Sequence, residues 1–335
     1  MYGHRLRDGT DGRSKGSFRE APIEKVSAVD ALFTNILFSP LGEKRNPAAV
    51  RRLVELTQGQ DAKLTLFGAV SEPSRLQRMV HRSGAIDAVL DAERKAMSAR
   101  LQRCTPKNDH LEIETMIALG DPALSIIERV LAAGHDLVAV TTDDDDEEQA
   151  TIKRLLRKCP CPVWVIRPTA ARIQRVLVAV NPDPAEAELN RTMLELAASM
   201  VAVGGGELHV VHGWELYGEA TMRSSAFLHT SAQDIEVLLD SEQVHHRRAL
   251  DELLSTAGLA DQPWQVHLHK GPAAEVVRRV AAKHRINLLL MGTVARTGVA
   301  GLIMGNTAES VLDRVRCSVI AVKPPGFVSP VERVR

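Results

Sequence analysis

The 335-residue chain contains the same arrangement of residues twice. Gly120-Asp-Pro-Ala is followed, sixteen positions later, by Asp136-Leu-Val-Ala-Val. Gly271-Pro-Ala-Ala is followed at the same distance by Asn287-Leu-Leu-Leu-Met. A repeat of this length is a whole domain used twice, and it is too long to be a solenoid unit. Differences between the two copies therefore become the best guide to what each copy does.

The end of each copy shows the same correspondence. Cys161-Pro-Val-Trp-Val-Ile-Arg-Pro matches Cys317-Ser-Val-Ile-Ala-Val-Lys-Pro. The copies are 151 residues apart at Gly120 and Gly271 but 156 apart at Cys161 and Cys317. The first copy has therefore lost about five residues in the loop that precedes its last apolar run.

Short apolar runs alternate with helical periodicity throughout both copies. Almost every residue in these runs is apolar, which is typical of strands buried on both faces of a parallel sheet. Five strands per copy, joined by helical crossovers, predict an open, doubly wound α/β sheet. The predicted strands span residues 35–38, 63–67, 111–117, 137–140 and 163–166 in the first copy, and 176–180, 207–211, 264–268, 288–291 and 319–322 in the second.

Helix starts and strand ends locate a ligand-binding rim. Asn46-Pro47, Asp121-Pro122 and Asp183-Pro184 each place a capping side chain before a proline that suits the first helical turn. Doubly wound sheets bind ligands beyond the carboxyl ends of their strands. In the second copy this rule brings Asn181, Asp183 and the segment from Gly292 onward to one rim.

Composition excludes several classes of protein. Lys+Arg and Asp+Glu balance at 42 each, so no overall field attracts nucleic acid or anionic lipid. No run approaches the ~20 apolar residues of a membrane span. The first 25 residues hold no signal peptide, and four cysteines do not form a secreted disulfide scaffold in a chain this long. These features predict a cytoplasmic protein.

A glycine-rich segment is the strongest chemical feature. Residues 291–312 run from a buried strand into a helix, and their four glycines allow the backbone to approach a ligand. Gly305-Asn306-Thr307 is predicted at the helix start, with Asn306 and Glu309 spaced as a capping box. Amides and the helix dipole there favour an anion. The spacing alone fits a phosphate site and a simple connecting turn equally well.

The segment resembles the universal stress protein family. Nucleotide-binding members carry Gly-x-x-Gly, nine residues and then Gly-Ser/Thr after the fourth strand. The pattern in this chain is Gly292-x-x-Ala295, nine residues, Gly305-Asn306. The wider string, followed by a closing strand and Lys323-Pro, is similar to the tandem E-type members. The resemblance covers residues 173–325 well and 33–168 in outline.

This resemblance implies two tandem flavodoxin-like domains of the adenine nucleotide alpha hydrolase-like type, each a five-stranded parallel sheet of order 3-2-1-4-5. The expected organisation is a disordered extension (1–30), a first domain with a degenerate loop (31–168), a second domain that retains the glycine loop (173–325) and a tail (326–335).

The resemblance also predicts how the copies associate. Single-domain members usually dimerise, partly through their last strands. A tandem chain can form this pairing internally, with Val163–Ile166 against Val319–Val322, and thereby cover two exposed sheet edges. The expected molecule is a pseudo-dimer, for which further homodimerisation stays open.

ATP or another adenine nucleotide is the cofactor that the resemblance implies. Amides near Gly292, Gly305 and Asn306 would hold phosphates, with the Thr307 hydroxyl nearby. Arg296 would neutralise charge, while Asn181 and Asp183 would lie near the base or ribose. No catalytic residue is predicted, because neither a Walker lysine motif nor a nucleophile elbow occurs.

Three residues depart from the family pattern. Ala295 adds a methyl group where glycine is usual, Asn306 replaces a Ser/Thr hydroxyl, and Asn181 replaces an aspartate. Together these changes weaken the expected ATP site. Asn181 also weakens any Mg²⁺ site, because hard cations favour carboxylate oxygens.

The first copy has acids where the second has glycines. Residues 143–148 are six consecutive acids in a loop without glycine. Carboxylates would repel phosphate, and the five-residue deletion is expected to remove the cradle. The interpretation is a partner scaffold with a solvated acidic surface, in preference to a second ATP site or a cation site.

Histidines form the remaining candidate group. His267 and His269 alternate along a strand and face the same way, and His245-His246 lies on a predicted helix. Such groupings can bind zinc, but this spacing matches no strong motif. No metal site is predicted.

The functional expectation is a stress-response protein that binds a small ligand and signals through its contacts without turning over substrate. Two alternatives remain open at this point. One is a slow ATPase or adenylating enzyme, suggested by the fold alone. The other is a binder of another amphipathic or lipid-linked ligand, suggested by the apolar residues 299–304 near the rim.

Overall fold

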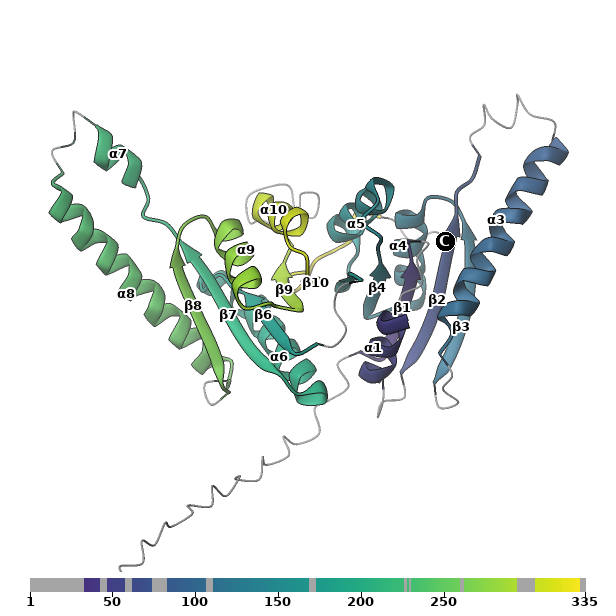
Figure 1. The fold of residues 1–335 in the computed structure, drawn as a ribbon, viewed down its shortest axis with the longest axis horizontal. Helices are drawn as coiled ribbons and strands as arrows, with labels where there is room; N and C mark the ends of the chain where they lie inside the picture. The colour runs from purple at the N-terminus through teal and green to yellow at the C-terminus, as the bar shows by residue number, and fades with distance from the viewer. Residues whose placement is uncertain are drawn as a thin grey trace, which may run out of the picture. The chain divides into compact units, whose positions relative to one another are not determined.

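Every predicted apolar run forms a strand in the computed structural model, which confirms the α/β class (Figure 1). Several strands continue a few residues beyond the predicted run. The strands are β1 (Asn35–Pro40), β2 (Lys63–Val70), β3 (Glu112–Leu119), β4 (Leu137–Thr141), β5 (Val163–Ile166), β6 (Arg175–Ala179), β7 (Glu207–Trp214), β8 (Trp264–Lys270), β9 (Leu288–Gly292) and β10 (Ser318–Val322).

The structure describes part of the chain, and every structural statement concerns that part. It comprises residues 33–42, 47–57, 62–73, 83–106, 111–168, 173–225, 228, 230–259, 262–293 and 305–331. The predicted disordered extension, the predicted cap Asn46, the end of the tail and most of the glycine-rich segment lie outside it.

The strands form one ten-stranded sheet of order β3-β2-β1-β4-β5-β10-β9-β6-β7-β8. Within each half the neighbouring strands are parallel, and each half has the order 3-2-1-4-5. The expected strand order is therefore confirmed, and the two five-stranded sheets are continuous with each other.

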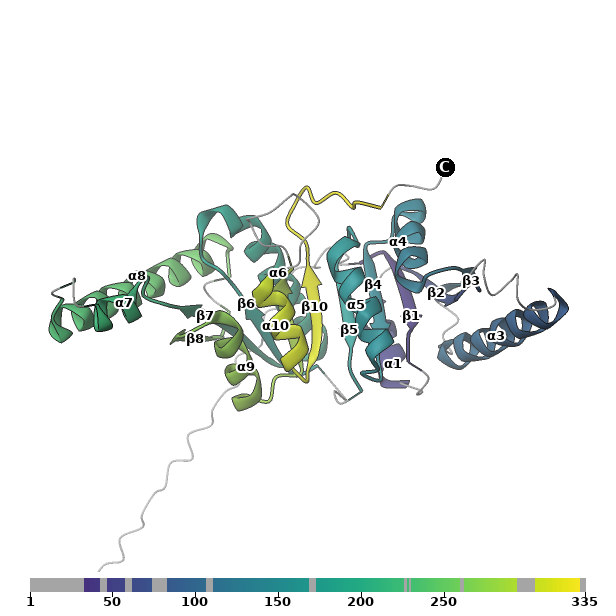
Figure 2. The same cartoon turned by 90° about the horizontal axis from the view of Figure 1, so that it is seen from above.

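Helices cover both faces of this sheet (Figure 2). One apolar core lies between the sheet and α4, α5, α9 and α10, and a second lies on the other face under α1, α6 and the buried sides of α3 and α8. The helices are α1 (Pro47–Thr57), α3 (Ser83–Cys104), α4 (Pro122–Ala133), α5 (Asp146–Lys158), α6 (Ala187–Gly204), α7 (Glu219–Ser224), α8 (Ala232–Thr256), α9 (Ala273–Lys283) and α10 (Asn306–Arg314).

Two of the predicted Asp-Pro helix starts form as expected. The backbone N–H of Leu124 donates to Asp121 Oδ1 at 3.0 Å, at the start of α4. The N–H of Ala185 donates to Asp183 Oδ1, also at 3.0 Å. Asp183 caps a single 3₁₀ turn, and α6 begins three residues after that proline.

The halves join through the predicted strand pair. β5 and β10 are antiparallel, with Val165 opposite Val319 and Trp164 opposite Ile320. Trp164 is fully buried in this junction. The internal pairing of the two closing strands is thus confirmed, and each strand covers the edge that the other would expose.

Ion pairs between α5 and α10 lie beside the strand junction. Lys153 Nζ lies 2.9 Å from Asp313 Oδ1 and 3.6 Å from Glu309 Oε1. Arg157 Nη2 lies 3.3 Å from the same Glu309 oxygen. Two helices from different halves are therefore tied together by charge as well as by sheet hydrogen bonds.

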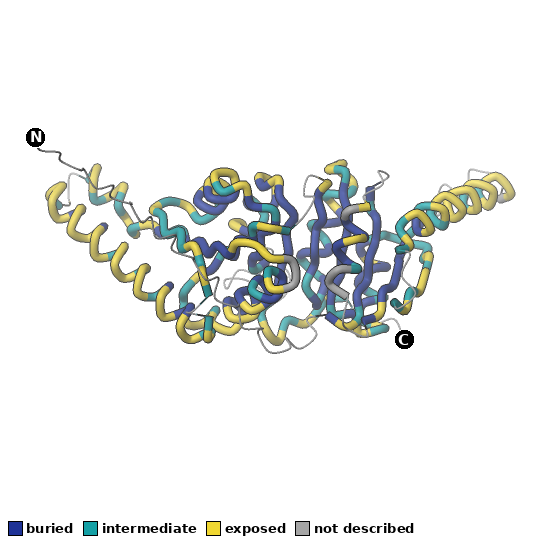
Figure 3. The backbone as a smooth tube through the Cα atoms, turned by 60° about the horizontal axis from the view of Figure 1, so that its bottom comes forward, coloured by how far each residue is buried: buried dark blue, intermediate teal, exposed yellow. Residues whose placement is uncertain are grey.

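Burial is concentrated in the inner strands of the sheet, whereas the edge strands β3 and β8 are partly exposed (Figure 3). The long helices α3 and α8 pack at either end of the sheet and are exposed along most of their length. None of the helices in the described ranges is long and apolar enough to cross a membrane.

Candidate functional site

The glycine-rich segment begins and ends at the carboxyl edge of β9. The N–H of Gly305 donates to the Thr293 carbonyl at 3.1 Å, and Thr293 N–H donates to the Val322 carbonyl at 3.2 Å. Thr293 and Gly305, which flank residues 294–304, therefore lie side by side at this edge. Ala295 and Arg296, predicted to contact a ligand, lie outside the described residues.

The predicted capping box at this helix does not form. Gly305, not Asn306, is the N-cap of α10, and no side chain in the described chain accepts a hydrogen bond from this helix start. This one-residue shift places Ala308 at the third helical position, where the box requires an acid. Glu309 instead pairs with Lys153 and Arg157 of α5. Asn306 and Thr307 lie in the first turn, whose amides have no partner within the helix.

Gly292 has a packing reason to be glycine. A Cβ atom built on it would come within 2.9 Å of Leu189 Cδ2 on α6. Real Cβ atoms essentially never approach a neighbour so closely. An alanine here would therefore require the Leu189 side chain to shift, which gives Gly292 a packing role that does not depend on a ligand.

Asn181 and Asp183 follow β6 on the same rim, as predicted. Asn190 Nδ2 donates to the Asn181 carbonyl at 2.6 Å, and Asn181 Nδ2 donates to Glu186 Oε1 at 3.4 Å. The structure thus brings both residues to the same carboxyl edge as Gly292 and Gly305, because β6 pairs directly with β9.

A histidine pair lies next to Asn181. The sequence identifies His246 only as part of His245-His246 on a predicted helix, and it does not predict the pairing with His212. His212 Nδ1 lies 3.1 Å from the Val180 carbonyl, and its Nε2 lies 3.0 Å from His246 Nδ1 on α8. Burial lowers the pKa of both histidines. Nδ1 of neutral His212 therefore donates to the carbonyl, and its Nε2 accepts from His246. This pair closes one side of the rim.

The corresponding rim of the first half is hollow. A cavity of about 680 Å³ lies there, lined by the ends of β1 and β2, by α3 and by the acidic residues 143–145, 147 and 148. The expectation that the shortened loop removes the phosphate cradle stays a prediction, although space remains at this rim. The hollow persists, but carboxylates in place of glycine amides line it.

Internal contacts hold several of these acids. Glu148 Oε2 accepts hydrogen bonds from Thr142 Oγ1 at 2.7 Å and from the Asp143 N–H at 2.6 Å. Asp145 caps α5, and Asp144 forms an ion pair with the largely buried Arg167. The acid run is therefore an ordered helix start as well as a charged lining.

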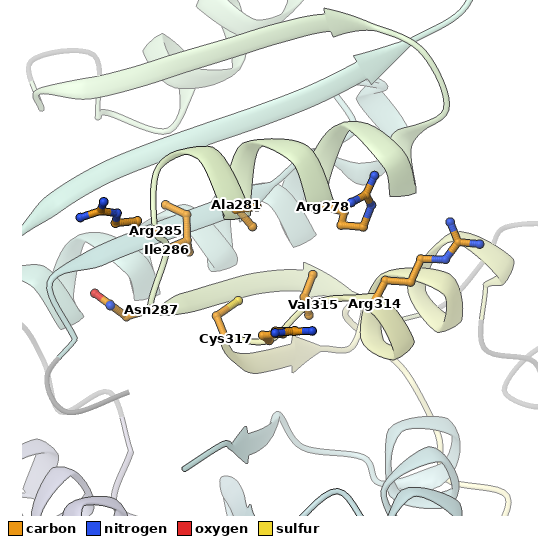
Figure 4. Close-up of a pocket in the computed structure, with 10 residues that line it drawn as sticks. Arg278, Ala281, Arg285, Ile286, Asn287, Arg314, Val315 and Cys317 are labelled. Carbon is orange, nitrogen blue, oxygen red and sulfur yellow. The ribbon is translucent and has the colours of Figure 1, made fainter. Parts of the chain in front are cut away.

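A basic pocket of about 500 Å³ lies at the opposite, amino ends of β9 and β10 (Figure 4). Arg278 and Arg314 face each other across its mouth and share Glu275, at 3.5 Å and 2.8 Å respectively. Arg285 and Asn287 lie at its other end. Sequence spacing does not predict this pocket, because its residues come from the ends of α9 and α10 and the loops that follow them, which the β9–β10 pairing brings together.

Comparisons with known proteins agree with this architecture. The Universal stress protein family matches the chain twice, at residues 35–167 and 172–323. Universal stress protein E of Escherichia coli K12 is 30% identical over 221 residues, which cover 63% of this chain and 68% of the relative. Universal stress protein E of Salmonella typhi is 27% identical over 320 residues, covering 90% of this chain and 98% of the relative.

Solved structures share the fold. A functionally unknown protein of Pseudomonas aeruginosa PAO1 has a TM-score of 0.62 and 23% identity, covering 89% of this chain and 95% of its own. A universal stress protein of Archaeoglobus fulgidus has a TM-score of 0.54 and 17% identity, covering 86% of this chain and 96% of its own.

Two doubly wound α/β halves in one sheet, matched twice by one family, define a tandem α/β domain protein. The chain belongs to the universal stress protein family, and it is similar along most of its length to universal stress proteins E.

Proposed function

We propose that this universal stress protein binds an adenine nucleotide, or a closely related anionic small molecule, at the rim of its second half. The observation that supports this most directly is the start of α10. That helix begins without a side-chain cap from the described residues, and Gly305 is bonded back to Thr293 beside it. A phosphate there would meet unpaired amides and the positive end of the helix dipole.

The residues present suit the phosphate part of such a ligand better than a metal. Asn181 offers an amide where a carboxylate would favour Mg²⁺. Asp183 Oδ1 already accepts a backbone hydrogen bond from Ala185. In this proposal any Mg²⁺ therefore arrives with the nucleotide, and Asn306, Thr307 and the segment containing Arg296 face the phosphates.

Binding without turnover is part of the proposal. The polar side chains described on the rim, Asn181, Asp183 and His212, each hold a neighbouring piece of the fold. In this proposal these side chains shape the rim and none of them acts as a catalytic base, which would need to lie within hydrogen-bond reach of the proton it abstracts. We place the action in the cytoplasm, because the four cysteines are free thiols, which suit a reducing compartment.

Contacts between the halves supply a route for signalling. Glu309, in the first turn of α10, pairs with Lys153 and Arg157 of α5. At the other end of α10, Arg167 donates to the Leu312 carbonyl at 3.2 Å and also pairs with Asp144. A ligand that shifts α10 would therefore change contacts in the first half.

Calorimetry with ATP, ADP and AMP, each with and without Mg²⁺, tests the proposal. We expect Thr307→Glu to abolish binding, because its carboxylate repels phosphate, while the helix itself tolerates an acid in its first turn. Thr192→Glu, the same change at an exposed position of α6, should bind normally. No heat at millimolar nucleotide, or equal binding by both variants, would refute the site, and phosphate release above the Thr307→Glu background would refute binding without turnover.

A further inference from the structure

Three histidines from separate elements lie close together, toward the amino ends of strands β7 and β8. His209 lies on β7, His267 on the edge strand β8, and His284 at the C-terminal end of α9. Their potential ligand atoms all lie within 4.8 Å of one another. The His267 and His284 rings are 4.4 Å apart between centroids. This group is separate from the ligand rim, which lies at the opposite ends of the same strands.

The register of β7 and β8 explains why His209 and His267 lie close together. Val211 of β7 is the direct partner of His267, and His209 lies two residues earlier on the same strand. Residues two apart on a strand share a face, so His209 and His267 are diagonal neighbours across the pair. α9 packs on that face of the sheet, and His284 is the residue that caps its C-terminal end.

The hydrogen-bond pattern leaves one imidazole nitrogen unpartnered. His209 Nδ1 lies 3.0 Å from His267 Nε2. His209 is fully buried, and its Nε2 makes no hydrogen bond within the described chain. That atom does lie 3.4 Å from Glu207 Oε2, close enough for an ion pair but too poorly aligned for a hydrogen bond. Glu207 is therefore the neighbour of Nε2, which leaves Nδ1 for the other two histidines.

We propose that His209, His267 and His284 bind a divalent transition metal ion of the zinc type. Three imidazoles with one open position are a recurrent zinc ligand set. Glu207 beside His209 Nε2 would hold that ring with Nδ1 directed at the metal, in the carboxylate–histidine–metal arrangement that orients such ligands. Imidazole favours Zn²⁺, Ni²⁺ and Cu²⁺, whereas Mg²⁺ and Ca²⁺ favour oxygen.

The spacing suits this ligand set. Zn–N bonds of about 2.0–2.1 Å separate tetrahedral ligand atoms by roughly 3.3 Å. His209 and His267 must therefore open by a few tenths of an ångström, while half-buried His284 moves inward.

Positively charged side chains near the three histidines lower their affinity for a metal cation. Arg175 acts on His209, Lys283 on His267, and Arg279 on His269, each lowering the pKa of its neighbour. These charges oppose a cation, and Glu207 is the acid that offsets them. Glu207→Gln is therefore expected to weaken binding by roughly 10–100-fold, the usual effect of losing such a partner.

The test is Zn²⁺ binding to the metal-stripped full chain. We expect about one zinc per chain by elemental analysis after removal of free metal, and a rise in the midpoint of thermal unfolding. His267→Gln and His284→Gln should lose both effects. His245→Gln, on an exposed face of α8, is the matched control and should keep both. Circular dichroism checks that each variant is folded.

Cobalt gives an independent readout. Co²⁺ bound by these histidines should show the strong visible absorption of a tetrahedral site, and His284→Gln should abolish it. Zinc that is not retained, or that is retained equally by His284→Gln, would overturn the proposal. Loss of zinc retention in His245→Gln would also overturn the proposal, because this result would assign the metal to the α8 histidines. Nucleotide binding does not enter this test, so either proposal can fail alone.

Discussion

At the scale of single residues, Lys323 shows how the halves are tied together. Its ammonium, at the end of β10, donates to the Leu156 carbonyl and lies 3.3 Å from the Arg157 carbonyl, both in the last turn of α5. It also lies 4.5 Å from the centre of the Phe327 ring. A cation at a helix C-terminus is favourable, but here the side chain is also buried. Burial lowers the pKa of Lys323 to about 8.

This pKa predicts a pH dependence of stability. Between pH 8 and the ordinary lysine value of 10.5, the folded chain holds a neutral amine while the unfolded chain binds a proton. Unfolding then takes up a proton, so the free energy of unfolding rises with pH across this window. The gain is at most about 3.5 kcal/mol, at about 1.4 kcal/mol per pKa unit.

Lys323→Met isolates this contribution from other titrating groups. Urea unfolding at pH 7.5, 9 and 10.5 should show wild type gaining stability relative to the variant as pH rises. A difference between the two proteins that stays constant with pH would contradict the assignment. Below pH 8 both states are protonated, so no change from this lysine is expected there.

At the scale of elements, local signals predict structure where the partners are close in sequence. Asp121 and Asp183 were expected to cap, and both do so through amides two or three residues away. The cap of α10 was misplaced by one residue, because Glu309 bonds to α5, more than 150 residues distant in sequence. The histidine cluster was missed for the same reason. His267 was noted, but its neighbour His209 is set by strand register, which spacing along one strand does not reveal.

Asp121 gives a prediction at this scale. It caps α4 and also pairs with Arg154 of α5, so Asp121→Ala removes both contacts. Loss of the cap should lower the free energy of unfolding by about 1 kcal/mol, within the usual range of about 0.5–2. Asp87→Ala, at an exposed position of α3, should stay within about 0.5 kcal/mol of wild type. Equal effects in chemical denaturation would contradict the capping role.

At the scale of the whole molecule, the junction of β5 with β10 makes one sheet out of two. The repeat and its apolar periodicity predicted the two α/β halves, and the family resemblance implied their strand order and this pairing. The hollow of the first half and the basic pocket were not predicted. Their shapes depend on which loops meet in space, and sequence spacing does not encode those distances.

Trp164 tests the importance of the junction. It is fully buried on β5 opposite Ile320, so Trp164→Ala should cost about 3–5 kcal/mol of unfolding free energy. Trp264→Ala makes the same change on the edge strand β8, where the side chain is only partly buried. We expect a clearly smaller loss there in urea unfolding. Similar losses for the two variants would mean that the junction is no more important than a sheet edge.

Covalent linkage of the paired closing strands has an evolutionary consequence. In a homodimer every mutation appears twice, so both subunits must keep whatever the assembly needs. Once the partners share one polypeptide, dilution cannot separate them and their stoichiometry is fixed. Each duplicate is then free to diverge independently, which accounts for an acidic lining in one and a glycine loop in the other.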